Sequence, residues 1–153
     1  MVSSMKSSVM IVTLILTGVV LYMTNQEHLN VRNNNPLNIR YNDRNDWLGQ
    51  VGETKGFARF KSVEYGFRAA YKLLLNYRQN YGLITIAQII SRWAPSNENN
   101  TQGYIDYVAK RLNFSPYETL SLERYPELIN AMADKEGKNN WNIEHVKQGI
   151  ALA

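Results

Sequence analysis

The first pattern along the chain is an uncharged apolar run from Val9 to Met23, with Lys6 just before it. The run is short against the roughly 20 residues that cross a bilayer comfortably. No small-residue cleavage site follows it, so the pattern favours an uncleaved signal-anchor over a signal peptide. We therefore predict a transmembrane segment over residues 1–25, a linker over 26–32, and a domain over 33–153 on the extracytoplasmic side of the membrane.

The start of the domain shows a period of two rather than a helical period. Turn-forming residues at 33–36 precede two short extended segments, Asn38–Tyr41 and Gly56–Lys61, and a polar loop lies between them. We interpret the two segments as a β-hairpin with a long tip.

From position 62 onward, apolar residues recur at helical spacing between recognisable caps and breakers. Ser62 and Gly82 bound a predicted helix over 63–81, and Ser115-Pro116-Tyr117-Glu118 has the form of a capping box that would start another. The remaining predicted helices begin after Thr85, Thr101, Arg124 and Asn142 and end near Pro95, Leu112, Gly137 and the C-terminus. The pattern predicts an α+β fold that is mainly helical.

Composition narrows the chemistry. The 153 residues include no cysteine and only two histidines, so disulfides, thiol catalysis, a histidine metal cluster and a Ser-His-Asp triad are all disfavoured. We expect no metal and no cofactor. The net charge of +4 favours an anionic partner such as membrane lipid, an acidic wall polymer or nucleic acid. Carboxylates, amides, hydroxyls and aromatic rings remain as the candidate functional groups.

Glu136 is the candidate catalytic carboxylate. On the predicted helix from Tyr125, it follows Ile129 by seven residues and Met132 by four, so it continues their apolar stripe. It also stands just before Gly137, at the negative end of the helix dipole. Burial and the dipole both favour a protonated carboxyl group, the form that a general acid requires in glycosidic cleavage.

Two other carboxylates are weaker candidates. Glu64 falls in the first turn of its helix, where the positive end of the dipole stabilises the ionised form and makes a poor acid. Glu53 lies on the hairpin side and is a candidate second carboxylate facing a cleft. Ring faces and amides for a glycan are expected from Tyr41, Trp47, Trp93, Tyr104, Asn35, Asn38 and Gln50.

Several ordered motifs resemble a phage and prophage family of wall-degrading proteins in the lysozyme-like superfamily. They read RNNNPLNIR at 32–40, WLGQ at 47–50, GFARF at 56–60, EYGFRA at 64–69 and RWAP at 92–95. Members of that family carry a His-Glu-Asn-Gly-like signature near the C-terminus. Here Lys135-Glu136-Gly137-Lys138 keeps the glutamate without the histidine and asparagine. The resemblance implies a lysozyme-like domain with Glu136 as its acid.

The hairpin also resembles a strand of wall glucosaminidases, in which the helix with the catalytic glutamate precedes the hairpin. In this chain that helix comes last. We therefore expect a permuted order in which the end of the helix that carries Glu136 lies beside the hairpin. This would place Glu136 close to Asn35 and Tyr104.

The resemblance implies cleavage of the β-1,4 bond between N-acetylmuramic acid and N-acetylglucosamine in peptidoglycan. Without a securely placed second carboxylate, a single-glutamate lytic transglycosylase is favoured over a muramidase. A wall endopeptidase and a non-catalytic wall-binding or virion structural protein remain alternatives. A helix-turn-helix DNA-binding reading of residues 85–112 is disfavoured by Asp106 and the long loop. The expected partners are glycan strands and the inner membrane, with no nucleic acid, for a monomer that is membrane-anchored or virion-associated.

Overall fold

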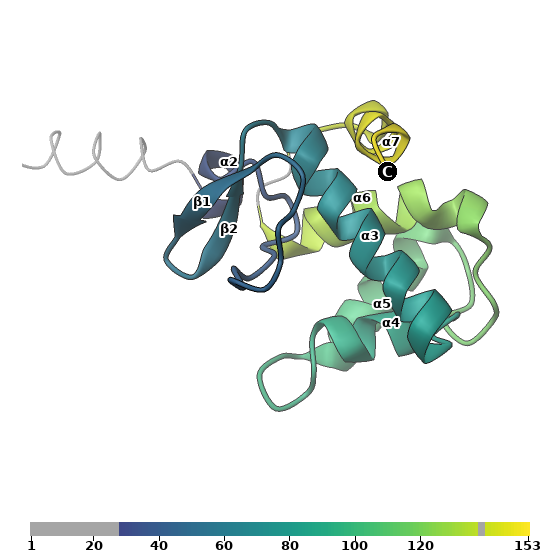
Figure 1. Ribbon diagram of the computed structural model, residues 1–153. Helices are drawn as coiled ribbons and strands as arrows, with labels where there is room; N and C mark the ends of the chain where they lie inside the picture. Colours follow the sequence, from purple (N-terminus) through teal and green to yellow (C-terminus); the bar gives the residue numbers. More distant parts are fainter. Residues whose placement is uncertain (1–27, 138–139) are drawn as a thin grey trace, which may run out of the picture.

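The computed structural model describes residues 28–137 and 140–153. The sheet has two strands. Figure 1 shows it at one end of the molecule, with a body of helices beside it. The predicted transmembrane segment lies outside the described residues. Within the described ranges, no helix is both long and apolar enough to cross a membrane.

The N-terminal part confirms a hairpin but corrects its strands. Strand β1 (Gln50–Thr54) pairs antiparallel with β2 (Phe57–Phe60) through a tight turn at Lys55 and Gly56, whose φ angles are 54° and 81°. Two positive φ angles in succession match the twist that a two-residue hairpin turn needs. The segment at 38–41, predicted as the first strand, instead lies along the other edge of β2, where Arg40 forms a single bridge with Phe57.

The short helix α2 (Leu29–Arg32) precedes this sheet, in a region assigned to the linker from sequence. Its Asn30 is buried. The residue that follows α2 contacts β2: the Phe60 amide donates to the Asn33 carbonyl oxygen at 2.9 Å. Residues 29–32 therefore form part of the folded domain.

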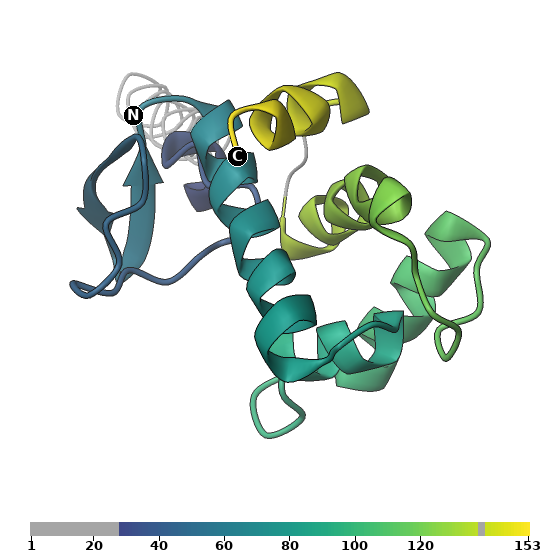
Figure 2. The same cartoon turned by 45° about the vertical axis from the view of Figure 1, so that its right-hand side comes forward.

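Helix α3 (Val63–Tyr81) runs through the middle of the molecule and has the predicted bounds (Figure 2). It ends at Gly82, which adopts a left-handed φ of 65°. Ser62 occupies the N-cap position without a side-chain cap and donates to Glu64 instead. A side chain at Gly66 would lie 2.2 Å from the Asn34 carbonyl oxygen, so a glycine here permits α3 to contact the segment before the sheet.

Helices α4 (Ile86–Trp93), α5 (Thr101–Leu112) and α6 (Tyr125–Glu136) follow, with a 3₁₀ turn η1 (Leu122–Arg124) before α6. Thr85 and Gln88 form a capping box at the start of α4. The helix predicted after Ser115 is absent, and residues 115–118 form a turn. The cause is tertiary: Thr119 bridges to Thr85 and the Leu120 side chain is fully buried, so no helix continues from the turn.

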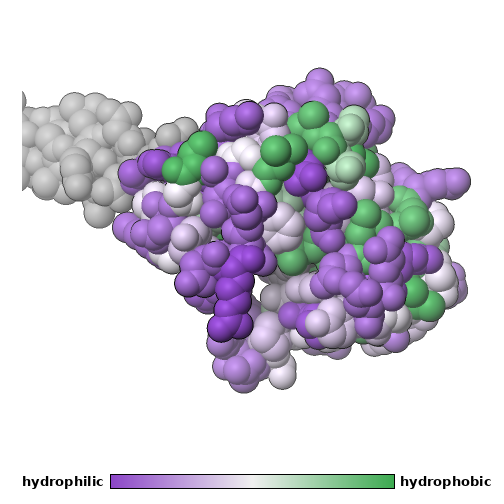
Figure 3. All heavy atoms as spheres, in the orientation of Figure 1, coloured by the Kyte–Doolittle hydropathy of each residue, from purple (hydrophilic) through white to green (hydrophobic). Residues whose placement is uncertain are grey.

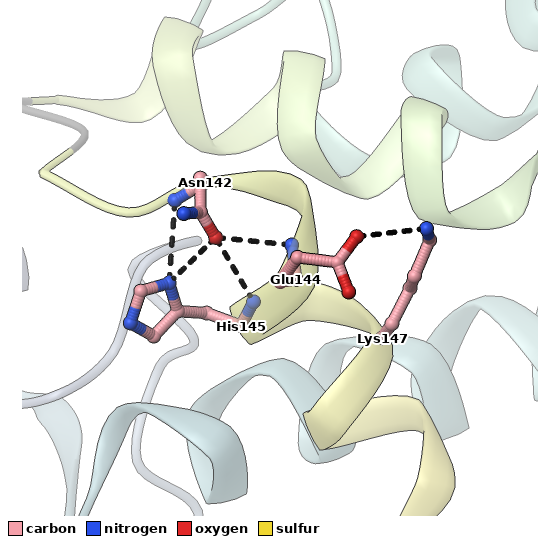
Figure 4. Close-up of polar contacts among 4 residues, drawn as sticks. All are labelled: Asn142, Glu144, His145 and Lys147. Carbon is pink, nitrogen blue, oxygen red and sulfur yellow. Dashed lines mark hydrogen bonds and ion pairs between the residues drawn. The ribbon is translucent and has the colours of Figure 1, made fainter.

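The last helix, α7 (Ile143–Ala151), begins as predicted at Asn142. The Asn142 side-chain oxygen accepts from the amides of Glu144 and His145 at 3.0 and 3.3 Å, and Lys147 pairs with Glu144 one turn on (Figure 4). Gly149 lets α7 lie close to α3, since a Cβ there would be 2.6 Å from that of Phe67. Helices α3 and α7 pack against each other and both contact α6, and the end of α6 meets the segment before the sheet, where Asn38 bonds to the Glu136 carbonyl oxygen.

Candidate active site

An open cleft of about 1040 Å³ separates the sheet side of the molecule from α4 and the loop that follows it. Figure 3 shows a hollow between these two parts, with hydrophilic atoms on the sheet side. The walls come from four places in the chain: β2 with the segment beside it, the middle of α3, the end of α4 with its loop, and the end of α6. The cleft is lined by Leu37, Asn38, Ile39, Arg40, Tyr41, Asn42, Asp43, Asn45, Phe57, Leu73, Tyr77, Trp93, Ala94, Pro95, Glu98, Asn99 and Glu136.

Glu136 lies in this cleft as the last residue of α6 and is half-buried. One of its oxygens, Oε1, accepts a hydrogen bond from the Trp93 indole Nε1 at 2.9 Å and another from the Tyr104 hydroxyl at 2.9 Å. Hydrogen bonds to a charged acceptor are among the stronger ones in proteins. The two donors come from α4 and α5, so three helices fix the orientation of this carboxyl group.

The Tyr104 hydroxyl keeps its proton over the ordinary pH range and donates it in the hydrogen bond to Glu136. Its side chain is 5% exposed, and burial raises the pKa of the Tyr104 hydroxyl far above the usual value of 10.0. The neighbouring Glu136 carboxylate raises that pKa further, both through its charge and through the hydrogen bond that it accepts. Tyr104 therefore keeps its proton and holds Oε1.

The backbone at the end of α6 is held from the sheet side. The Asn38 side-chain amide donates to the Glu136 carbonyl oxygen at 2.9 Å, and Asn38 adopts a left-handed φ of 50°. This bond satisfies one of the carbonyls that a helix leaves unpaired at its C-terminus. A side chain at Gly137 would come within 3.0 Å of Asn30, so α2 also borders this point. The predicted closeness of Glu136 to Tyr104 is confirmed by their hydrogen bond, and the contact from the hairpin side comes from Asn38, whereas the hydrogen bonds of the Asn35 side chain go to positions 39 and 58.

The structure divides the predicted binding residues. Asn38, Tyr41 and Trp93 line the cleft with Glu136, while Tyr104 lies buried behind the carboxyl group. Asn35 is fully buried and does not line the cleft. Its amide donates to the carbonyls at positions 39 and 58 and accepts from the amide at position 39. Asn35 therefore braces the sheet, and its predicted contact with a ligand is not supported.

Trp47 and Gln50 lie outside the cleft, half-buried at the start of β1. Among the described residues, neither the Trp47 indole nitrogen nor the Gln50 side-chain oxygen finds a hydrogen-bond partner. The two lesser carboxylate candidates are also elsewhere. Glu53 accepts from the Gly56 amide at 2.8 Å and so stabilises the hairpin turn, and Glu64 accepts from Ser62 at the start of α3.

Sequence reasoning missed most of the cleft wall. Amides at Asn42, Asn45 and Asn99 line it, together with the ring of Tyr77 and the guanidinium-bearing Arg40. A usable signal existed in the asparagine-rich composition of the two loops at 42–45 and 96–100. In the described ranges, no three histidine, aspartate or glutamate side chains gather as metal ligands do.

No established protein-family profile matches the chain. Protein P5 of Pseudoalteromonas phage PM2 is 36% identical to it over 152 residues, and the aligned region covers 95% of each of the two chains. Similarity of this extent over nearly the whole length shows common descent. The chain therefore belongs to the same family as protein P5 of that bacteriophage.

Proposed function

We propose that this protein cleaves the β-1,4 glycosidic bond between N-acetylmuramic acid and N-acetylglucosamine in peptidoglycan, in a lysozyme-like arrangement. One observation carries the proposal: a half-buried glutamate is held by two aromatic donors in an open cleft lined by amides and rings. Carbohydrate chemistry uses these groups, because amides bond to hydroxyl and acetamido groups while rings cover the apolar faces of sugars.

Glu136 is the proposed general acid. Both donors converge on Oε1, and in the described part of the chain no donor reaches Oε2. Oε2 is thus the oxygen that would carry the proton and deliver it to the glycosidic oxygen of a bound strand. Tyr104 is a positioning residue in this scheme, since its buried hydroxyl acts only through the orientation of the carboxyl group. Trp93 also orients the carboxyl group, and in addition it lines the cleft.

We further propose that the reaction is a lytic transglycosylation. A hydrolase needs a second carboxylate at a defined separation across the scissile bond. Asp43 and Glu98, the other acids that line the cleft, are both exposed and come from its outer loops. A single acid suffices when the C6 hydroxyl of the muramic acid attacks its own anomeric carbon. The C1–O bond to the leaving sugar breaks, the leaving oxygen takes the Glu136 proton, and the C6 hydroxyl proton returns to the carboxylate.

The decisive experiment compares the full-length chain, purified in mild detergent, with Glu136→Gln on purified peptidoglycan, with mass spectrometry of the released fragments. Glu127→Gln is the matched control, because Glu127 is an exposed carboxylate on the same helix, away from the cleft. We expect anhydro-muropeptides from the wild type and the control and none from Glu136→Gln. Fragments with reducing ends would make the enzyme a muramidase, and release by all three proteins would remove Glu136 from the mechanism.

A second candidate is a wall-binding protein without catalytic activity. The specific observation in its favour is that several amides and rings of the cleft, among them Tyr41, Tyr77 and Asn99, have no hydrogen bond to Glu136 in the described part of the chain. The same preparations decide the matter: sedimentation with insoluble peptidoglycan, combined with no released fragment from any of them, would establish binding alone.

For the N-terminal segment we propose membrane anchoring, with the cleft on the extracytoplasmic side, in a phage protein for lysis or wall penetration. The apolar run at 9–23 and Lys6 before it support this orientation. Extraction of membranes with alkaline carbonate tests the proposal, because an anchored protein stays with the lipid and a peripheral one is released.

A further inference from the structure

The charges in the cleft are unequal. Of the described residues that line it, Arg40 is the one cation, whereas Asp43, Glu98 and Glu136 bring carboxyl groups. No ion pair or side-chain hydrogen bond joins Arg40 to another residue in the described ranges. An exposed arginine that carries the one positive charge among the described lining residues is a candidate for binding an anionic part of the ligand.

Arg40 has a defined position relative to Glu136. It pairs with Phe57 across the edge of β2, and its guanidinium carbon lies 5.6 Å from the centre of the Phe57 ring. Ile39 before it is buried, so Asn38 and Arg40 flank a core residue and both line the cleft. Asn38 bonds to the Glu136 carbonyl oxygen, so Arg40 lies two residues along the chain from a contact with the proposed acid, in the wall of the same cleft.

The Phe57 ring increases what this arginine can contribute. An isolated exposed arginine gains little from an ion pair, because ordering its long side chain offsets the attraction. The Phe57 ring beneath the guanidinium restricts the side-chain conformations of Arg40 before a ligand binds, and the guanidinium N–H groups remain available for two parallel hydrogen bonds. The two oxygens of a carboxylate match the geometry of those N–H groups.

We propose that Arg40 binds a carboxylate of the muramic acid unit and so selects peptidoglycan over unsubstituted N-acetylglucosamine polymers. This inference rests on the proposed function. Muramic acid differs from glucosamine by a lactyl ether, which ends in a free carboxylate or continues into a peptide that has carboxylates of its own. The shared chemistry is a carboxylate beside the sugar ring, and Arg40 is the cleft group that recognises it.

The test compares full-length wild type with Arg40→Gln on three substrates: intact peptidoglycan, glycan strands stripped of peptide by an amidase, and chitooligosaccharides. Stripped strands retain the lactyl carboxylate, and chitooligosaccharides carry none. Arg59→Gln is the matched control, since Arg59 is an exposed arginine on β2 that does not line the cleft. Arg40→Lys keeps the positive charge but cannot form the two parallel hydrogen bonds of a guanidinium.

We expect Arg40→Gln to raise KM about tenfold on the substrate whose carboxylate is bound, with kcat nearly unchanged, because one charge-assisted contact is lost. A rise on stripped strands identifies the lactyl carboxylate, and a rise on intact peptidoglycan alone identifies the peptide. Chitooligosaccharide cleavage should not change, Arg40→Lys should recover part of the loss, and Arg59→Gln should behave as wild type. An equal loss on all three substrates, or no loss on any, overturns the inference.

The inference is separable from the proposed function. If the wild type releases no fragment from any substrate, the glycosidase proposal fails, and sedimentation with insoluble peptidoglycan or chitin then decides the role of Arg40. Loss of peptidoglycan binding alone in Arg40→Gln supports carboxylate recognition. Equal binding of wild type and variant to peptidoglycan refutes it.

Discussion

The hydrogen bond between Tyr104 and Glu136 can be tested without any assumption about activity. A double-mutant cycle built from Tyr104→Phe and Glu136→Ala isolates the interaction between the two side chains. The hydroxyl and Oε1 are 2.9 Å apart, and Tyr104 is 5% exposed, so water weakens this bond very little. Phenylalanine keeps the ring and its packing, and alanine removes the acceptor.

The expected coupling is about 1.5–3 kcal/mol, the range for a hydrogen bond with one charged partner. Urea unfolding of the full-length proteins in detergent, followed by far-ultraviolet circular dichroism, yields the four free energies of unfolding. Each single variant should lose stability, since each leaves a polar group without its partner. The double variant should be more stable than the sum of the two losses predicts.

Tyr107→Phe provides the control cycle. Tyr107 lies on the same helix, half-buried, and contacts Lys135 rather than Glu136. Tyr107→Phe and Glu136→Ala should add within about 0.5 kcal/mol, as independent sites do. If Tyr104→Phe and Glu136→Ala were additive to the same degree, the bond would contribute nothing and the positioning role of Tyr104 would be refuted.

Three further predictions follow from individual residues. Burial raises the pKa of the Tyr104 hydroxyl above 10.0, so above pH 10 the folded protein keeps a proton that the unfolded chain releases. The contribution of Tyr104 to the free energy of unfolding is therefore constant below pH 10 and falls by about 1.4 kcal/mol per pH unit above it. In urea unfolding at alkaline pH, Tyr104→Phe should show a shallower fall than the wild type. Asn35→Ala should cost about 3 kcal/mol or more in urea unfolding, since three buried hydrogen bonds between the Asn35 side chain and the backbone are lost. The exposed Asn42→Ala should cost under about 0.5 kcal/mol. Gly66→Ala should lower the melting temperature far more than Gly82→Ala. A Cβ at position 66 would lie 2.2 Å from a backbone oxygen, whereas a Cβ at position 82 would meet open space and add only the strain of a positive φ. Equal shifts in melting temperature would contradict this packing.

The helices were predictable because their limits are written locally. Gly82, Thr85, Gly137 and Asn142 end or cap helices at the expected positions. Strand β1 was missed because its one large apolar residue, Val51, is half exposed, so the strand leaves almost no hydrophobic pattern. The false capping box at 115–118 shows the converse, since pairing with the segment before α4 overrides a good local signal.

The site was predictable only in part. Position on an apolar stripe selected Glu136, and the structure places it in the cleft. Its donors, Trp93 and Tyr104, are 43 and 32 residues away in sequence, and their convergence depends on how α4 and α5 cross α6. No local pattern fixes those crossings. Asn35 illustrates the opposite error. The sequence suggests a side chain free to bind a ligand, but its amide is buried and hydrogen-bonded to the surrounding backbone.

The energetics of this cluster argue for a role beyond stability. Placing a carboxylate where water is partly excluded costs free energy of desolvation. The hydrogen bonds from Trp93 and Tyr104 offset that cost but give no net stabilisation. Apolar side chains of similar volume would fill the same space at equal or lower free energy. A triple variant, Glu136→Leu with Tyr104→Phe and Trp93→Phe, removes the carboxyl group together with both of its donors and should therefore fold at nearly wild-type stability while releasing no glycan fragments. If that variant were several kcal/mol less stable than the wild type, the cluster would be structural, and the proposed catalytic role of Glu136 would lose its physical basis.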